Sequence, residues 1–113
     1  MSRPPQINTV EEQRREMVRV ARGILNGGIG IVSGARQLTH LRFCSRSDNN
    51  SDLLIFVGID SESDHLPLGD VRRHWNVKAL KIKDEELNRF EARVKERAFR
   101  ACEGIIAKYD RVA

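Results

Sequence analysis

The side chains best suited to chemistry lie together near the middle of the chain. Three carboxylates alternate there and a histidine follows them: Asp60, Glu62, Asp64 and His65. Alternating carboxylates are ligands of the kind that hard divalent cations prefer, but a calcium loop that starts at Asp60 needs glycine at position 65 and glutamate at position 71. His65 and Val71 stand there instead. The segment therefore predicts an exposed acidic loop for a basic protein partner, with a divalent-metal-dependent enzyme as an alternative.

A basic segment with the only tryptophan of the chain follows the acidic loop. Its residues are Arg72, Arg73, His74 and Trp75. Tryptophan and arginine are common anchors of protein interfaces. For Trp75 we favour the alternative that it fills the core where the chain enters the next helix, but we keep it in the candidate set. The candidate partner-binding residues are Asp60, Glu62, Asp64, His65, Arg72, Arg73 and Trp75.

Arginines recur at helical spacing near both ends of the chain. The first series is Arg15, Arg19 and Arg22, and the second is Arg89, Arg93, Arg97 and Arg100. Two such series on adjacent helix faces would form a surface that binds phosphates. Glutamates accompany the arginines in both segments, however, and the chain has few aromatic residues on which bases could stack. Nucleic-acid binding is therefore the second hypothesis, after contact with another protein.

A glycine-rich segment in the first third of the chain does not match a phosphate-binding loop. A dinucleotide fingerprint that starts at Gly28 needs glycine or alanine at position 33, where Ser33 stands. A Walker loop needs lysine after its last glycine, but Ala35 follows Gly34. The segment predicts a tight turn between two helices, and Gly30 and Gly34 would let another helix approach closely.

Two helices are predicted around this turn, over about residues 9–25 and 30–43. The first begins with a capping box, in which Thr9 is the cap and Glu12 follows three residues later. Because the link between the two helices is short, they are expected to form an antiparallel hairpin.

The middle of the chain is predicted to alternate between polar loops and one apolar segment. Residues 45–52 and 60–70 read as loops by composition. Residues 53–59 form a continuous apolar run, for which we slightly favour a buried strand over a short helix capped by Asp52. A short helical turn is expected at residues 71–75.

The last third of the chain is predicted to be one long helix over about residues 77–109. Apolar residues form one stripe along it: Leu80, Leu87, Phe90, Val94, Ala98, Ala101 and Ile105. Acid–base pairs four residues apart support the helix: Glu85–Arg89, Glu91–Lys95 and Glu96–Arg100. If the helix breaks, Lys83 and Gly104 are the expected points.

Composition indicates one small globular domain. The chain has 113 residues, of which 40% are hydrophobic and 32% charged, with a formal net charge of +4. One domain over residues 1–113 is expected, with residues 1–7 as a flexible N-terminal arm. Because no apolar run reaches the roughly 20 residues that cross a bilayer and no secretory signal is evident, we expect no membrane contact and a cytoplasmic location. Cys44 and Cys102 are expected to be reduced and buried, and neither a metal nor a cofactor is expected.

The predicted fold class is mainly α, a small helical bundle with a helical hairpin, a short β insert at about residues 53–59 as one alternative, and a long C-terminal helix. The stretch FVGIDSESDHLPLGDVRRHWNVKALKIK, from Phe56 to Lys83, resembles small bacterial domains of uncharacterised function. Proteins of this size and helical character include immunity proteins, which neutralise a toxin by binding it. We therefore expect a non-catalytic protein-binding module of immunity or regulatory type, and the long amphipathic helix also suggests a homodimer.

Overall fold

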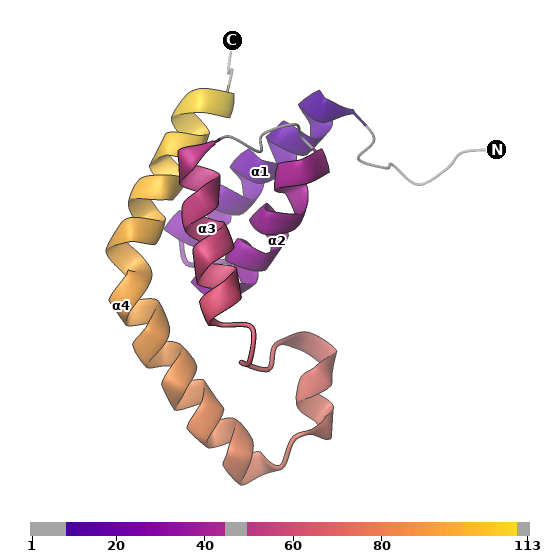
Figure 1. Ribbon diagram of the computed structural model, residues 1–113, viewed down its shortest axis with the longest axis vertical. Coiled ribbons are helices and arrows are strands. Elements are labelled where there is room, and N and C mark those ends of the chain that lie inside the picture. Colours follow the sequence, from indigo (N-terminus) through magenta and orange to yellow (C-terminus); the bar gives the residue numbers. More distant parts are fainter. Residues whose placement is uncertain (1–8, 45–49, 111–113) are drawn as a thin grey trace, which may run out of the picture.

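The computed structural model describes residues 9–44 and 50–110, except for the side chains of residues 43 and 44. Within these ranges the chain forms helices and no strand (Figure 1): α1 (Val10–Leu25), α2 (Ile31–Cys44), α3 (Ser51–Glu62), the 3-10 helix η1 (Gly69–His74) and α4 (Val77–Tyr109). The mainly α bundle with a long C-terminal helix is thus confirmed. The predicted N-terminal arm, residues 1–7, lies outside the described residues. In the described part of the chain, no helix has both the length and the apolar character needed to cross a membrane.

The predicted helical hairpin is present in α1 and α2. Thr9 caps α1, because its hydroxyl oxygen accepts a hydrogen bond from the backbone N–H of Glu12 at 3.0 Å. Gly27 ends the helix with φ +84°, a left-handed conformation that glycine adopts without strain. Gly34 is buried against Ile24 of α1, so the expected close approach of a second helix at this glycine is confirmed.

The preference for a strand at residues 53–59 was wrong, because this run lies inside α3. Asn50, and not Asp52, caps the helix, and its side-chain oxygen accepts from the N–H groups of Asp52 and Leu53 at 2.9 and 3.1 Å. Leu53, Phe56 and Ile59 are buried at spacings of three residues, which is a helical repeat. Residues 51–52 and 60–62, which were predicted to belong to loops, are therefore part of α3. Residues 45–49 of the first predicted loop lie outside the described residues.

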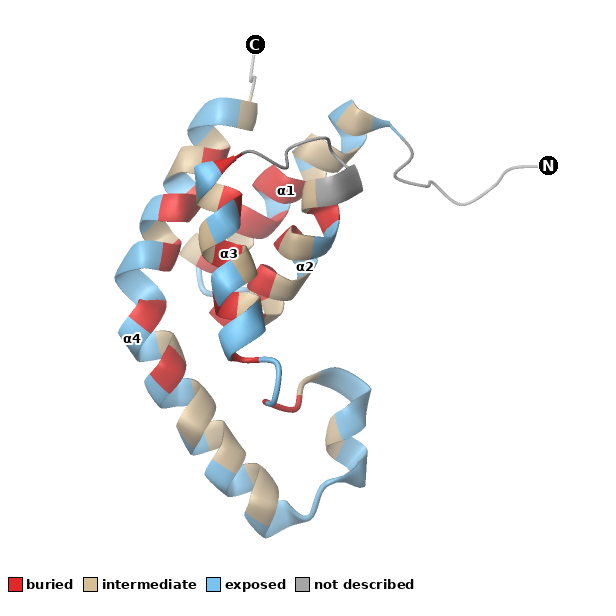
Figure 2. Cartoon of the chain, viewed as in Figure 1, coloured by how far each residue is buried: buried red, intermediate tan, exposed pale blue. Residues whose placement is uncertain are grey.

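The long predicted helix is continuous as α4, without a break at either expected point. Its predicted stripe faces the core from the middle of the helix onward: Phe90, Val94, Ala98, Ala101 and Ile105 are buried. Here α4 packs against α1 and α3, while α2 packs against α1 and α3. Figure 2 shows that the buried positions gather in this upper part of the bundle, leaving the first half of α4 without them.

Candidate protein-binding site

The chain extends beyond its core in an arm formed by η1 and the first half of α4, residues 69–89 (Figure 1). None of these residues is buried. An arm without a core needs other interactions to fix its two branches relative to each other.

Two polar ties supply these interactions. Arg72 of η1 donates two hydrogen bonds to the carboxylate of Asp84 on α4, at 2.7 and 2.9 Å. His65 contacts Glu86 of α4, and Lys83 donates to the same carboxylate at 3.4 Å. The hydrogen bond from Arg72 lowers the pKa of Asp84, and the contact with His65, aided by Lys83, lowers the pKa of Glu86. His65 and Arg72, both predicted to contact a partner, are therefore used within the chain.

These lowered pKa values predict how the ties respond to acid. A carboxyl group whose pKa is lower in the folded chain stabilises the fold above its ordinary pKa of about 4 and loses that contribution as the pH falls through the lowered value. We expect the thermal midpoint to fall by a few degrees less between pH 6 and pH 3 in Asp84→Asn/Glu86→Gln than in the parent chain. Glu62→Gln, which removes an exposed carboxylate without an ion pair in the described residues, is the control. If the thermal midpoints of the parent and the double variant fell equally between pH 6 and pH 3, these carboxylates would not stabilise the arm.

The end of the arm exposes large apolar side chains beside basic ones. Val71, Trp75 and Val77 are 53%, 36% and 81% exposed, and Arg73 and His74 beside them are also exposed. We call these five residues the tip surface. The interpretation of Trp75 as a core residue was wrong, since it lies outside the buried cluster.

The predicted acidic loop is divided between a helix end and a turn. Asp60 lies inside α3, half-buried, with its carboxylate 3.6 Å from Nε of Arg36 on α2. Arg36 also donates to the carbonyls of Ser63 and Leu66 at 2.9 and 3.0 Å, and so holds the C-terminal end of α3. The remaining two acids, Glu62 and Asp64, are exposed. Among the described residues, no three His, Cys, Asp or Glu side chains converge as metal ligands would.

The first arginine series is matched by acids at every position. Arg15 pairs with Glu11, Arg19 with Glu16, and Arg22 with Asp110. In the second series, Arg100 pairs with Glu96 at 2.7 Å and Arg93 lies over the ring of Phe90 at 5.2 Å. Arg89 and Arg97 are exposed, with no ion pair in the described part of the chain.

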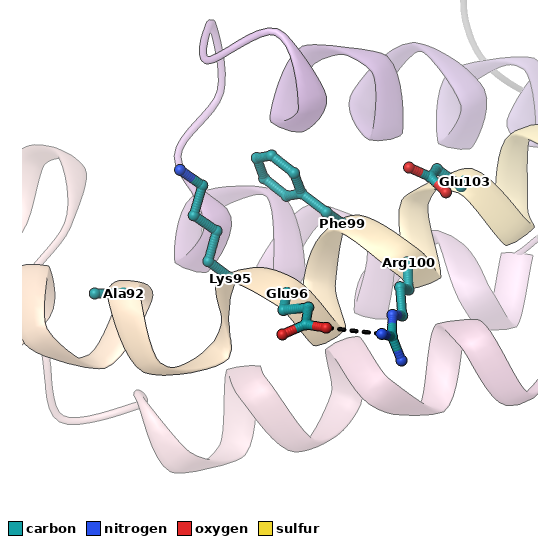
Figure 3. A pocket seen from close by; sticks show the side chains of 6 residues that line it. All are labelled: Ala92, Lys95, Glu96, Phe99, Arg100 and Glu103. Atoms are coloured by element: carbon teal, nitrogen blue, oxygen red, sulfur yellow. Dashed lines mark hydrogen bonds and ion pairs between the residues drawn. The ribbon is translucent and has the colours of Figure 1, made fainter.

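Sequence reasoning missed a shallow hollow on the outward face of α4 (Figure 3). It is lined by Ala92, Lys95, Glu96, Phe99, Arg100 and Glu103. The ammonium group of Lys95 lies 5.4 Å from the ring centre of Phe99, and the Glu96–Arg100 ion pair forms the opposite rim. The only sequence signal for this hollow was the predicted ion pair of Glu96 with Arg100, which forms part of its rim.

Cys102 is free and fully buried in the bundle, as predicted. Burial, aided by the negative charges of Glu103 and Asp52, raises the pKa of its thiol to about 12. Since the thiolate is the reactive form, we expect iodoacetamide to alkylate Cys102 at pH 8 at least about 100-fold more slowly in the folded chain than in guanidinium. The measurement uses the Cys44→Ser variant, in which Cys102 is the only thiol that can react, and mass spectrometry gives the rates in the folded and the unfolded chain. Similar rates would show that Cys102 is accessible. The side chain of Cys44 lies outside the described residues.

The fold and this geometry define a mainly helical protein, and its large exposed apolar residues concentrate on the arm that the two polar ties hold in place. Comparison with protein-family models, with curated proteins and with solved structures found no match. The assignment of the candidate site therefore depends on the exposure and the charge of the tip surface alone.

Proposed function

We propose that the chain is a non-catalytic binding module that holds another protein at the tip surface, as a toxin-neutralising or regulatory protein would. The observation that carries the proposal is the exposure of Val71, Trp75 and Val77 within seven consecutive residues of an arm that has no buried residue. Apolar side chains concentrated in this way favour contact with another surface, because burying them there removes apolar area from water.

The polar ties support this proposal, because they fix the arm before any partner binds. Arg72 and Asp84 form a two-pronged ion pair, which restrains η1 against α4 more firmly than a single hydrogen bond would. A surface held in place loses less conformational entropy on binding than a flexible loop. The tip surface is thus suited to recognition by a preformed shape.

The charge of the arm indicates the chemistry of the partner. Arg73 and His74 come directly before Trp75, and Lys78 and Lys81 follow in the first turns of α4, all exposed. A partner with an apolar pocket surrounded by acidic groups would match this surface, and opposite charge would also speed the encounter. This differs from the basic partner that the acidic loop predicted.

The proposal is tested by affinity capture of the tagged chain from a lysate of its source cells, with nuclease added, and mass spectrometry of what is retained. One stoichiometric protein is expected on the parent chain and on Leu54→Ala, which changes an apolar residue 48% exposed on α3. It is expected to be lost from Val71→Ser/Trp75→Ala. A partner retained equally by all three chains would place the site elsewhere, and retention that nuclease abolishes would favour nucleic-acid binding.

With the partner purified, Trp75→Ala is expected to raise its dissociation constant by about 30-fold or more, since a tryptophan at the centre of an interface contributes at least ~2 kcal/mol. Titration calorimetry measures the constant. Glu62→Ala/Asp64→Ala separates the tip surface from the predicted acidic loop, and a larger loss in this variant would assign the contact to the acids.

A further inference from the structure

The outward face of α4 carries a series of side chains spaced alternately by four and three residues. We call it the outer stripe: Lys78, Ile82, Glu85, Arg89, Ala92, Glu96, Phe99 and Glu103. All are exposed except Phe99, which is half-buried. This spacing keeps side chains along one line of a helix, as in coiled coils. By helical geometry the line lies on the far side of α4 from the core residues Phe90, Val94 and Ala98, except that Phe99 stands at its inner edge and also packs against the core.

The outer stripe contains a projecting apolar side chain and a hollow whose apolar part lies between charged side chains. Ile82 is 63% exposed and stands between charged neighbours. The hollow lies farther along the same line, with the ring of Phe99 and the methyl group of Ala92 as its apolar part. Figure 3 shows Lys95 and Phe99 on the side of α4 that faces the violet N-terminal segments and the Glu96–Arg100 pair on the other side, and residues from both sides line the hollow.

We propose that a second copy of this chain binds antiparallel along the outer stripe, with Ile82 of each copy in the hollow of the other. A two-fold axis would lie midway between Ile82 and Phe99, which are about 25 Å apart along the helix. The contact then occurs twice, and each copy uses the same residues on both sides of the axis. A second copy of the chain is thus sufficient to fill the hollow and to bury Ile82, because both features lie on the same stripe.

Charge selects the antiparallel arrangement. Lys78 stands at one end of the outer stripe and Glu103 at the other, so antiparallel copies bring opposite charges together at both ends. A parallel pair would place Lys78 against Lys78 and Glu103 against Glu103. In the antiparallel pair Glu85 approaches Glu96 of the second copy, and Arg89, which stands one turn from Glu85 on the same stripe and has no ion pair among the described residues, offsets the repulsion.

The tip surface and the outer stripe share no residue, and Lys78 of the stripe only adds to the basic charge beside the tip surface, so substitutions at Trp75 and Ile82 separate this inference from the proposed function. Trp75→Ala is expected to leave self-association unchanged. Conversely, Ile82→Glu is expected to leave partner capture by the tip surface unchanged, so each proposal fails on its own measurement.

Sedimentation equilibrium of the full chain over a wide range of concentration tests the inference. A monomer–dimer equilibrium is expected, and Ile82→Glu should raise its dissociation constant by at least about tenfold. Leu54→Glu is the matched control, since it places the same charge at an exposed apolar position on α3, and it should have no effect. A chain that is monomeric at every concentration overturns the proposal, as does a dimer that Ile82→Glu leaves intact.

Charge reversal tests the orientation. Lys78→Glu and Glu103→Lys should each weaken self-association, because each puts like charges at both ends of the pair. A mixture of the two variants should associate more tightly than either alone, since each end of the mixed pair then joins one acidic and one basic side chain. The double variant Lys78→Glu/Glu103→Lys should restore the parent affinity. Failure of both the mixture and the double variant to recover would overturn the antiparallel arrangement.

Discussion

Replacing Phe56 by alanine is expected to lower the free energy of unfolding by about 3–5 kcal/mol, because it removes a large side chain from a close-packed core. Phe56 is fully buried and belongs to α3, which packs against α2 and α4. Its neighbours cannot fill the space without moving two helices. Urea unfolding followed by far-ultraviolet circular dichroism measures the change.

Leu54→Ala is the matched control for Phe56→Ala, and it also tests the helix. Leu54 is 48% exposed, so its truncation is expected to cost no more than about 0.5 kcal/mol. In a strand, residues 54 and 56 would point to the same face, and both substitutions would act alike. In a helix they point to nearly opposite faces. Equal losses from the two variants would therefore contradict α3.

Replacing Gly34 by alanine is expected to lower the free energy of unfolding by about 1–3 kcal/mol, although alanine favours helix formation. A Cβ atom at this position would lie 2.4 Å from Cδ1 and 2.6 Å from Cγ1 of Ile24. Ile24 is itself 2% exposed, so its side chain has little room to move away. The helices α1 and α2 would have to separate.

Gly58→Ala is the control for this close approach, because it makes the same change within a helix. A Cβ atom at Gly58 would meet no atom within 4 Å. We expect this variant to be more stable than the parent chain by about 0.5–1 kcal/mol, from helix propensity alone. Thermal and urea unfolding give both values. If Gly34→Ala also stabilised the chain, Ile24 would have to adopt another rotamer without loss of packing.

The middle of the chain shows where local pattern is insufficient. The apolar run 53–59 fits a strand or a helix, because a fully buried segment has apolar residues on every side in either structure. Asn50 decides in favour of the helix by capping it, and the described residues contain no strand with which this segment could pair. A buried strand without a neighbour would leave its backbone groups unsatisfied.

The candidate site was predicted only in part, because contacts between distant elements assign the polar residues. His65 and Arg72 were predicted to face a partner, but they meet Glu86 and Asp84 within the chain. Trp75 was favoured as a core residue, yet the chain turns it outward at the end of the arm. Residue type alone does not show whether a side chain contacts a partner or another part of the same chain.

The sequence by itself determined the features that depend on neighbours within about four residues: the Thr9 cap, the hairpin turn at its glycines, and the apolar stripe of α4. The tertiary structure alone decided which side chains remain exposed and which charges are used internally. Glu91, for example, was predicted to pair with Lys95 but accepts a hydrogen bond from the backbone N–H of Val32 at 2.9 Å. The physical reason is that helix formation and capping are local, whereas the partner of a carboxylate depends on which helix end the packing of the core brings beside it.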